Sequence, residues 1–122
     1  MQSVEIMANA RRDVEAKPDS ADAHFQYARL LEQEGVLEEA CAEYMKACDI
    51  KGDFVDAHVC CGNLLRRLGR SKDAEAYLKK AISVDPMSYS ARFSYAALLE
   101  DMRRYEEAEE EYLKAANIQA DV

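Results

Sequence analysis

The chain has 122 residues, of which 49% are hydrophobic and 33% are charged, and only four are glycine and two are proline. This composition suits one compact domain of helices joined by short turns. The net charge of −8, with no basic stripe in the sequence, argues against nucleic acid as a partner, because a phosphate backbone is bound through cationic side chains.

No apolar stretch approaches the ~18 residues of a membrane-spanning helix, so we expect no membrane partner. Residues 1–17 lack the basic start and apolar centre of a signal peptide, and we therefore expect a cytoplasmic location. The four cysteines are interpreted as small buried hydrophobic residues in a reducing compartment. They are Cys41, Cys48, Cys60 and Cys61.

Residues 3–17 are predicted to form the first helix, because apolar residues recur there at helical spacing. Pro18 ends this helix, and Asp19 or Ser20 can cap the next one. We expect the segment 1–18 to be a capping helix that covers the first of the repeats that follow it.

From residue 21 onward, small and apolar residues recur with a period of 34. Ala40, for example, is followed by Ala74 and Ala108. A period of this length indicates stacked helical units that bury their apolar faces against one another. Three copies fit the chain, at residues 21–54, 55–88 and 89–122.

Each copy is predicted to contain two helices. The expected ranges are 21–34 and 37–50 in the first copy and 55–68 in the second, where the next helix follows Ser71 and ends at Asp85-Pro86. In the third copy we expect a helix after Ser88 and one over 106–118. Gly35 and Gly69 supply the left-handed residue that ends the first helix of their copies. Arg103 stands at this position in the third copy, where we expect a strained or differently shaped turn. Ser71 is predicted to cap the second helix of its copy.

Small residues also recur inside the helices, at Ala28, Gly62 and Ala96. Such residues allow the two helices of one copy to approach closely. We therefore expect a larger side chain at Gly62 to destabilise the fold by overpacking.

The spacing His58-x2-Cys61-Gly62-x2-Leu65, followed by Ala74-x3-Leu78 and Pro86 in the middle copy, resembles a tetratricopeptide repeat. The resemblance covers most of the chain. It implies an all-α fold, a right-handed superhelical array of antiparallel helix pairs, with three units plus an N-terminal helix and about seven helices. It also implies a non-catalytic adaptor or scaffold that binds a protein or peptide partner.

By this resemblance, the first helix of each copy lines a concave peptide-binding groove. The groove residues are expected to be Phe25, Gln26, Arg29, Val59, Cys60, Asn63, Arg67, Phe93, Ser94 and Ala97.

Two interpretations of the ladder Phe25–Val59–Phe93 stay open. It can form an apolar floor on which a peptide docks, flanked by the arginine and asparagine donors of the groove. Alternatively, these side chains can be partly buried between neighbouring helices. The carboxylate clamp of chaperone-binding tetratricopeptide repeats is absent, because its positions hold uncharged residues except at Arg29.

No constellation in the sequence indicates catalysis, a cofactor or a metal site. His24 and His58 occupy the same position of the repeat, which favours a packing role over zinc binding. The acidic pairs on the second helices suit helix starts and solvated faces. There is no glycine-rich phosphate loop or nucleophile motif, so we expect no enzyme activity and no cofactor.

A second function is kept beside the adaptor: a structural assembly unit that associates end to end through its terminal helices, or part of a longer array. The last helix has an apolar strip that a following helix would cover, which makes a homodimer possible. This oligomer edge consists of Tyr112, Leu113, Ala116 and Ile118.

Overall fold

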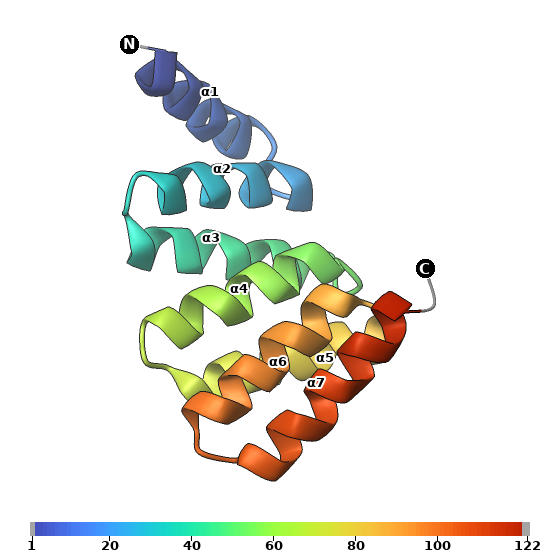
Figure 1. The fold of residues 1–122 in the computed structure, drawn as a ribbon. Coiled ribbons are helices and arrows are strands. Elements are labelled where there is room, and N and C mark those ends of the chain that lie inside the picture. The colour runs from blue at the N-terminus through green and yellow to red at the C-terminus, as the bar shows by residue number, and fades with distance from the viewer. Residues whose placement is uncertain (1, 121–122) are drawn as a thin grey trace. The chain divides into compact units, whose positions relative to one another are not determined.

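The computed structural model describes residues 2–120, and the described part contains helices and turns but no strand. Figure 1 shows the helices in chain order. They are α1 (Gln2–Ala16), α2 (Ala21–Gln33), α3 (Leu37–Ile50), α4 (Val55–Arg67), α5 (Ser71–Val84), α6 (Tyr89–Asp101) and α7 (Tyr105–Ala120). The predicted all-α helical repeat fold is therefore confirmed.

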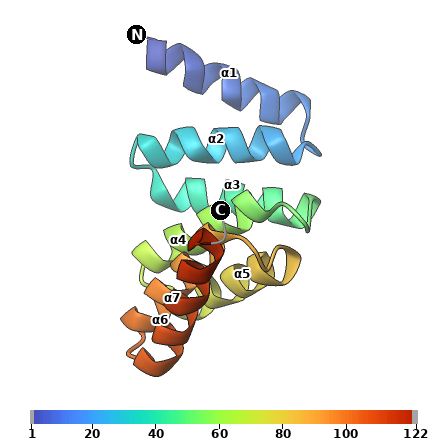
Figure 2. The same ribbon diagram turned by 45° about the vertical axis from the view of Figure 1, so that its right-hand side comes forward.

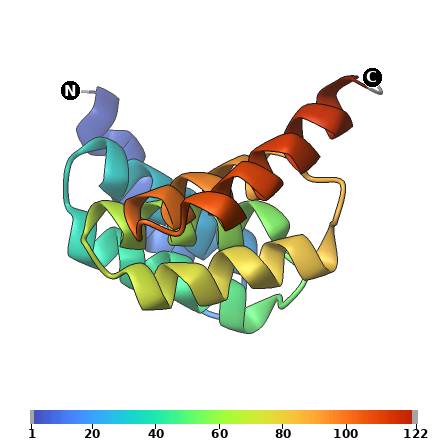
Figure 3. The same ribbon diagram turned by 60° about the horizontal axis from the view of Figure 1, so that its bottom comes forward.

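The helices form two compact units, residues 1–57 and 58–122. In the N-terminal unit, α2 packs against both α1 and α3, and the three lie side by side (Figure 2). In the C-terminal unit, α6 packs against both α5 and α7 (Figure 3). Every predicted helix is present in the described part of the chain, and α3 begins and ends at the predicted residues.

Two helices begin with a serine cap. The hydroxyl of Ser20 accepts a hydrogen bond from the Ala23 N–H at 3.1 Å, and Ser88 does the same for Ala91 at 3.1 Å. The predicted cap at Ser71 is wrong, because α5 already begins at that residue and Arg70 before it makes no side-chain cap. Where the cap is present, it satisfies one of the backbone donors left open at a helix start.

The turn inside each copy has the same shape in all three. Gly35, Gly69 and Arg103 have φ values of 80°, 78° and 62°. The N–H of each, and that of the next residue, donates to a carbonyl group of the preceding helical turn. This is the Schellman arrangement. Arg103 thus adopts the left-handed conformation despite its Cβ, so the third turn is strained as expected but is not differently shaped.

In the C-terminal unit, the backbone of α4 lies against a leucine of α5. A Cβ built on Gly62 would lie 2.6 Å from Cγ of Leu78, which is fully buried. Ala28 and Ala96 hold the same position in the other copies and are also fully buried. The expectation that small residues allow a close approach is consistent with this packing.

The side chain of His24 makes polar contacts in addition to packing in the core. Its Nδ1 lies 2.6 Å from Oε1 of the buried Glu43, and its Nε2 lies 2.7 Å from the carbonyl oxygen of Pro18. The imidazole therefore joins α2 to α3 and to the turn that precedes α2. The sequence predicted only a packing role here, because Glu43 lies 19 residues away on another helix.

Arg92 makes the corresponding contacts in the third copy. Its Nε donates to the carbonyl oxygen of Pro86 at 3.1 Å, and a terminal nitrogen donates to Oε2 of Glu111 at 3.0 Å. A polar side chain at this position thus ties the two helices of a copy to the turn before them, in the first and third copies alike.

We predict that Gly62→Ala destabilises the protein by about 1–3 kcal/mol, because Leu78 must leave its packed rotamer. Gly52→Ala is the control, since a Cβ there would meet no heavy atom within 4 Å. Urea unfolding monitored by circular dichroism measures both changes. Equal stability of the two variants would contradict the close approach of α4 and α5.

We predict that Arg103→Gly stabilises the protein. Relief of the left-handed conformation contributes about 1–2 kcal/mol, and the greater freedom of glycine in the unfolded chain offsets about 0.5–1 kcal/mol. The matched change Gly69→Ala, at the same position of the second turn, should lower stability. Thermal unfolding of both variants shows whether each change raises or lowers the stability. A lower melting temperature for Arg103→Gly would be inconsistent with strain at Arg103.

We predict that His24→Phe destabilises the protein by about 1–3 kcal/mol, because the buried Glu43 loses a hydrogen-bond partner. His24→Arg should cost less than His24→Phe, since Arg92 already makes these contacts in the third copy. Denaturant titration separates the two outcomes. If arginine is no better tolerated than phenylalanine, the polar contacts of His24 do not stabilise the unit.

Candidate protein-binding surface

The ten predicted groove residues divide by their exposure. Phe25, Val59, Ser94 and Ala97 are buried. Cys60 and Asn63 are half-buried, and Gln26, Arg29, Arg67 and Phe93 are exposed. A partner can therefore touch only some of the residues that the sequence assigned to the groove.

Phe25 is a core residue of the N-terminal unit and is only 8% exposed. Its ring centroid lies 5.8 Å from that of Tyr44 and 4.9 Å from that of Phe54, which follows α3. The guanidinium carbon of Arg29 lies 5.8 Å above the same ring. Of the two interpretations of the ladder, burial therefore holds for Phe25, and it also holds for Val59.

Phe93 has the same repeat position as Phe25 but is 46% exposed. Its ring centroid lies 5.4 Å from that of Tyr112 in a T-shaped pair, and 5.8 Å from that of Tyr89, on which the ring stacks. We call Tyr89, Phe93 and Tyr112 the aromatic cluster. The position that Phe54 holds in the first copy corresponds to Val122, which lies outside the described residues.

The cluster continues into an open groove of about 440 Å³ along α7. We call it the α7 groove, and its lining consists of Glu100, Tyr105, Ala108, Glu109, Tyr112, Leu113 and Ala116. Three residues of the predicted oligomer edge line it, and Leu113 among them is 58% exposed. The fourth, Ile118, is half-buried and is not part of the lining.

Carboxylates surround this apolar surface. Tyr112 donates a hydrogen bond to Oε1 of Glu100 at 2.8 Å. Partial burial and this hydrogen bond raise the pKa of the Tyr112 hydroxyl. Helix α7 also carries five glutamates against one lysine. Glu109 is exposed and has no hydrogen bond or ion pair among the described residues.

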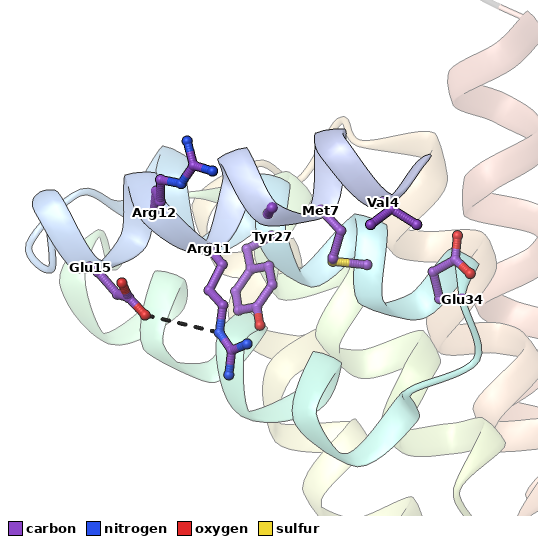
Figure 4. Close-up of a pocket in the computed structure, with 8 residues that line it drawn as sticks. Val4, Met7, Arg11, Arg12, Glu15, Tyr27 and Glu34 are labelled. Atoms are coloured by element: carbon purple, nitrogen blue, oxygen red, sulfur yellow. Dashed lines mark ion pairs between the residues drawn. The ribbon is translucent and has the colours of Figure 1, made fainter. Parts of the chain in front are cut away.

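The N-terminal unit has a pocket of about 450 Å³ between α1 and α2, which the sequence did not predict. Figure 4 shows Met7 and Arg11 of α1 and Tyr27 of α2 among the residues that line it. Nε of Arg11 lies 4.0 Å from Oε1 of Glu15. On another side of α2, Gln26 and Arg29 line a hollow together with residues of α1. These two groove residues therefore face the first helix.

The described residues contain no cluster of three or more His, Cys, Asp or Glu side chains that could hold a metal ion. Both ring nitrogens of His24 are already engaged. None of the helices in the described part of the chain is long and apolar enough to span a membrane.

The sequence reasoning missed Tyr89 and Tyr105 as surface residues of this region. A signal for both was present. Tyr89 precedes Phe93 by four residues and Tyr105 precedes Tyr112 by seven, spacings that place side chains on one helical face. Their exposure could not be predicted, because it depends on which segment packs on α7.

Comparisons with known proteins agree on one family. The tetratricopeptide repeat family matches the sequence over residues 21–54 and 62–121, which together make up most of the chain. No curated protein matches it in sequence.

Solved structures similar to this chain include two of MamA and one of YrrB. A crystal structure of MamA is 19% identical, with a TM-score of 0.89, over 94% of this chain and 67% of that one. A structure of MamA MSR-1 is 20% identical, with a TM-score of 0.82, over 94% and 66%. YrrB, described as a TPR protein with an unusual peptide-binding site, is 20% identical, with a TM-score of 0.84, over 96% and 60%.

At these identities the solved structures establish the fold alone, and this chain spans about two thirds of MamA and 60% of YrrB. The family matches, the repeated helix pairs and the 34-residue period all agree. The chain belongs to the tetratricopeptide repeat family.

Proposed function

We propose that this chain is a non-catalytic adaptor that binds a segment of a partner protein, and that the aromatic cluster of the C-terminal unit is the contact. The exposure of Phe93 carries the proposal. Phe25 and Tyr44 form the same pair in the first copy and are covered, whereas Phe93 and Tyr112 leave aromatic surface open to solvent. Exposed aromatic side chains that are held rigidly by neighbours are favoured at the centres of protein interfaces.

Polar groups of α4 support this reading. Asn63 and Arg67 lie one helical turn apart, and both retain exposed surface. They offer an amide and a guanidinium, which can donate to the carbonyl groups of a bound chain. Proteins of this family serve as interaction modules in general. YrrB, which shares the fold, is described by its peptide-binding site. The four cysteines suit an adaptor in the reducing cytoplasm.

The alternative is an assembly unit that pairs two copies through α7, and the exposed apolar strip on α7 supports it. Repulsion between the glutamates of the two copies opposes such a pairing, however. A two-fold axis at Leu113 would bring Glu109 and Glu110 of one copy toward the same residues of the other. Like charges across an interface cost affinity, so the surface suits a partner of different charge better than a second copy.

The test is to select peptides that bind the full chain from a random library, and to measure their affinity by fluorescence anisotropy. We predict that Phe93→Ala weakens binding by about tenfold or more, the loss expected when an interface aromatic is truncated. Met87→Ala is the control, because Met87 is an exposed apolar residue of the same unit outside the cluster. Circular dichroism checks that both variants remain folded.

Selected peptides that bind Phe93→Ala and the double variant Asn63→Ala/Arg67→Ala as tightly as the wild type would overturn the assignment of this surface. A failure to select any peptide would overturn the adaptor function itself.

A further inference from the structure

The α7 groove repeats a face of α5 that another helix already covers within the C-terminal unit. Helix α6 packs on α5. A shift of 34 residues carries the residues of α5 onto those of α7. The pairs that matter are Ala74 and Ala108, Glu75 and Glu109, and Leu78 and Tyr112.

Helix α6 and the turn after it are anchored on α5 through one carboxylate. The buried Tyr95 donates its hydroxyl hydrogen to Oε2 of Glu75 at 3.1 Å, and Arg104 donates to the same oxygen at 2.9 Å. Two donors, one of them cationic, thus converge on a carboxylate at an apolar helix contact. Charge-assisted hydrogen bonds of this kind fix the register of the two helices.

The pKa shifts of Tyr95 and Glu75 are consistent with these hydrogen bonds. Burial and the hydrogen bond to Glu75 raise the pKa of Tyr95 to about 12. Burial alone would raise the pKa of Glu75, but the hydrogen bonds from Arg104 and Tyr95 outweigh it and hold the pKa below its usual range. Glu75 therefore stays ionised in the contact.

A similar arrangement recurs on α7, where no helix of residues 2–120 fills the groove. Glu109 stands where Glu75 stands, but it is exposed and has no partner among the described residues. Tyr112 is half-buried, whereas Leu78 is fully buried, and Leu113 beside it is open to solvent. The α7 groove thus has apolar residues and a carboxylate, as the α5 face does. Among the described residues, no hydrogen-bond donor contacts Glu109 in the way that Tyr95 and Arg104 contact Glu75.

We propose that the α7 groove receives an amphipathic helix of a partner protein, and that this helix carries a tyrosine or arginine donor for Glu109. The inference rests on the proposed protein-binding function and specifies the class of partner. The apolar side of the helix covers Tyr112, Leu113 and Ala116, apolar residues that line the groove. Its donor reaches Glu109 as Tyr95 and Arg104 reach Glu75.

The charge of α7 selects a basic partner. Five glutamates and one lysine lie on this helix, so a helix with cationic flanks is attracted and an acidic one is repelled. A second copy offers no such helix, because its own α6 is already packed on α5 and its α7 carries the same negative charge.

The probe is a synthetic peptide with the sequence of residues 88–104, which contains α6 and the following Arg104. It is labelled with a fluorophore and titrated with the full chain. We expect saturable binding, with a loss of about tenfold or more for Glu109→Lys and for Leu113→Glu. Glu110→Lys is the matched control, since it makes the same charge change on α7 outside the groove. A peptide with Tyr95→Phe and Arg104→Ala should bind more weakly than the parent.

Absence of binding at about 1 mM chain would overturn the inference. The inference would also be overturned if Glu109→Lys and Leu113→Glu left the affinity of the peptide unchanged. The peptide would then displace α6 from α5 or bind elsewhere. A wild-type chain that sediments as a dimer and becomes monomeric on Leu113→Glu would make the second copy the occupant, and would overturn it too. If library peptides still bind in a Phe93-dependent way, the inference fails while the proposed function stands.

Discussion

In the C-terminal unit, the backbone of α4 passes so close to Leu78 that no side chain fits between them. Ala28 and Ala96, at the same position of the other copies, are fully buried as well. Two antiparallel helices bury little surface unless they approach closely, and a residue with little or no side chain at the crossing allows the larger residues around it to interlock. The hydrogen bonds of His24 and Arg92 then fix the first and third helix pairs to the turns before them.

Local features of the fold could be predicted from the sequence because they depend on neighbours in the chain. The limits of α3, the serine cap of α2 and the left-handed turns all follow from residues within a few positions. Contacts between helices could not be predicted in the same way. The pairing of His24 with Glu43 and the burial of Phe25 by Phe54 depend on which side chains meet in space, 19 and 29 residues apart.

The candidate site illustrates this limit most clearly. Phe25 with Tyr44 and Phe93 with Tyr112 are the same pair in the sequence, and a pattern alone assigns them the same role. One pair became part of a core because a phenylalanine after α3 covers it. The other remained a surface. In a repeat protein the segment that follows a unit decides whether its apolar residues stabilise the fold or meet a partner.

The left-handed Arg103 joins the two helices that form this surface. In stacked repeats, stability is close to a sum of terms for each unit and for each contact between neighbours. The strained turn lowers the intrinsic stability of the α6–α7 hairpin. The open groove on α7 adds no stabilising contact with a neighbour. This hairpin should therefore undergo local opening more readily than α2–α3. A ligand that binds only the closed hairpin would suppress that opening, so that binding at the surface and folding of the last repeat become one linked equilibrium.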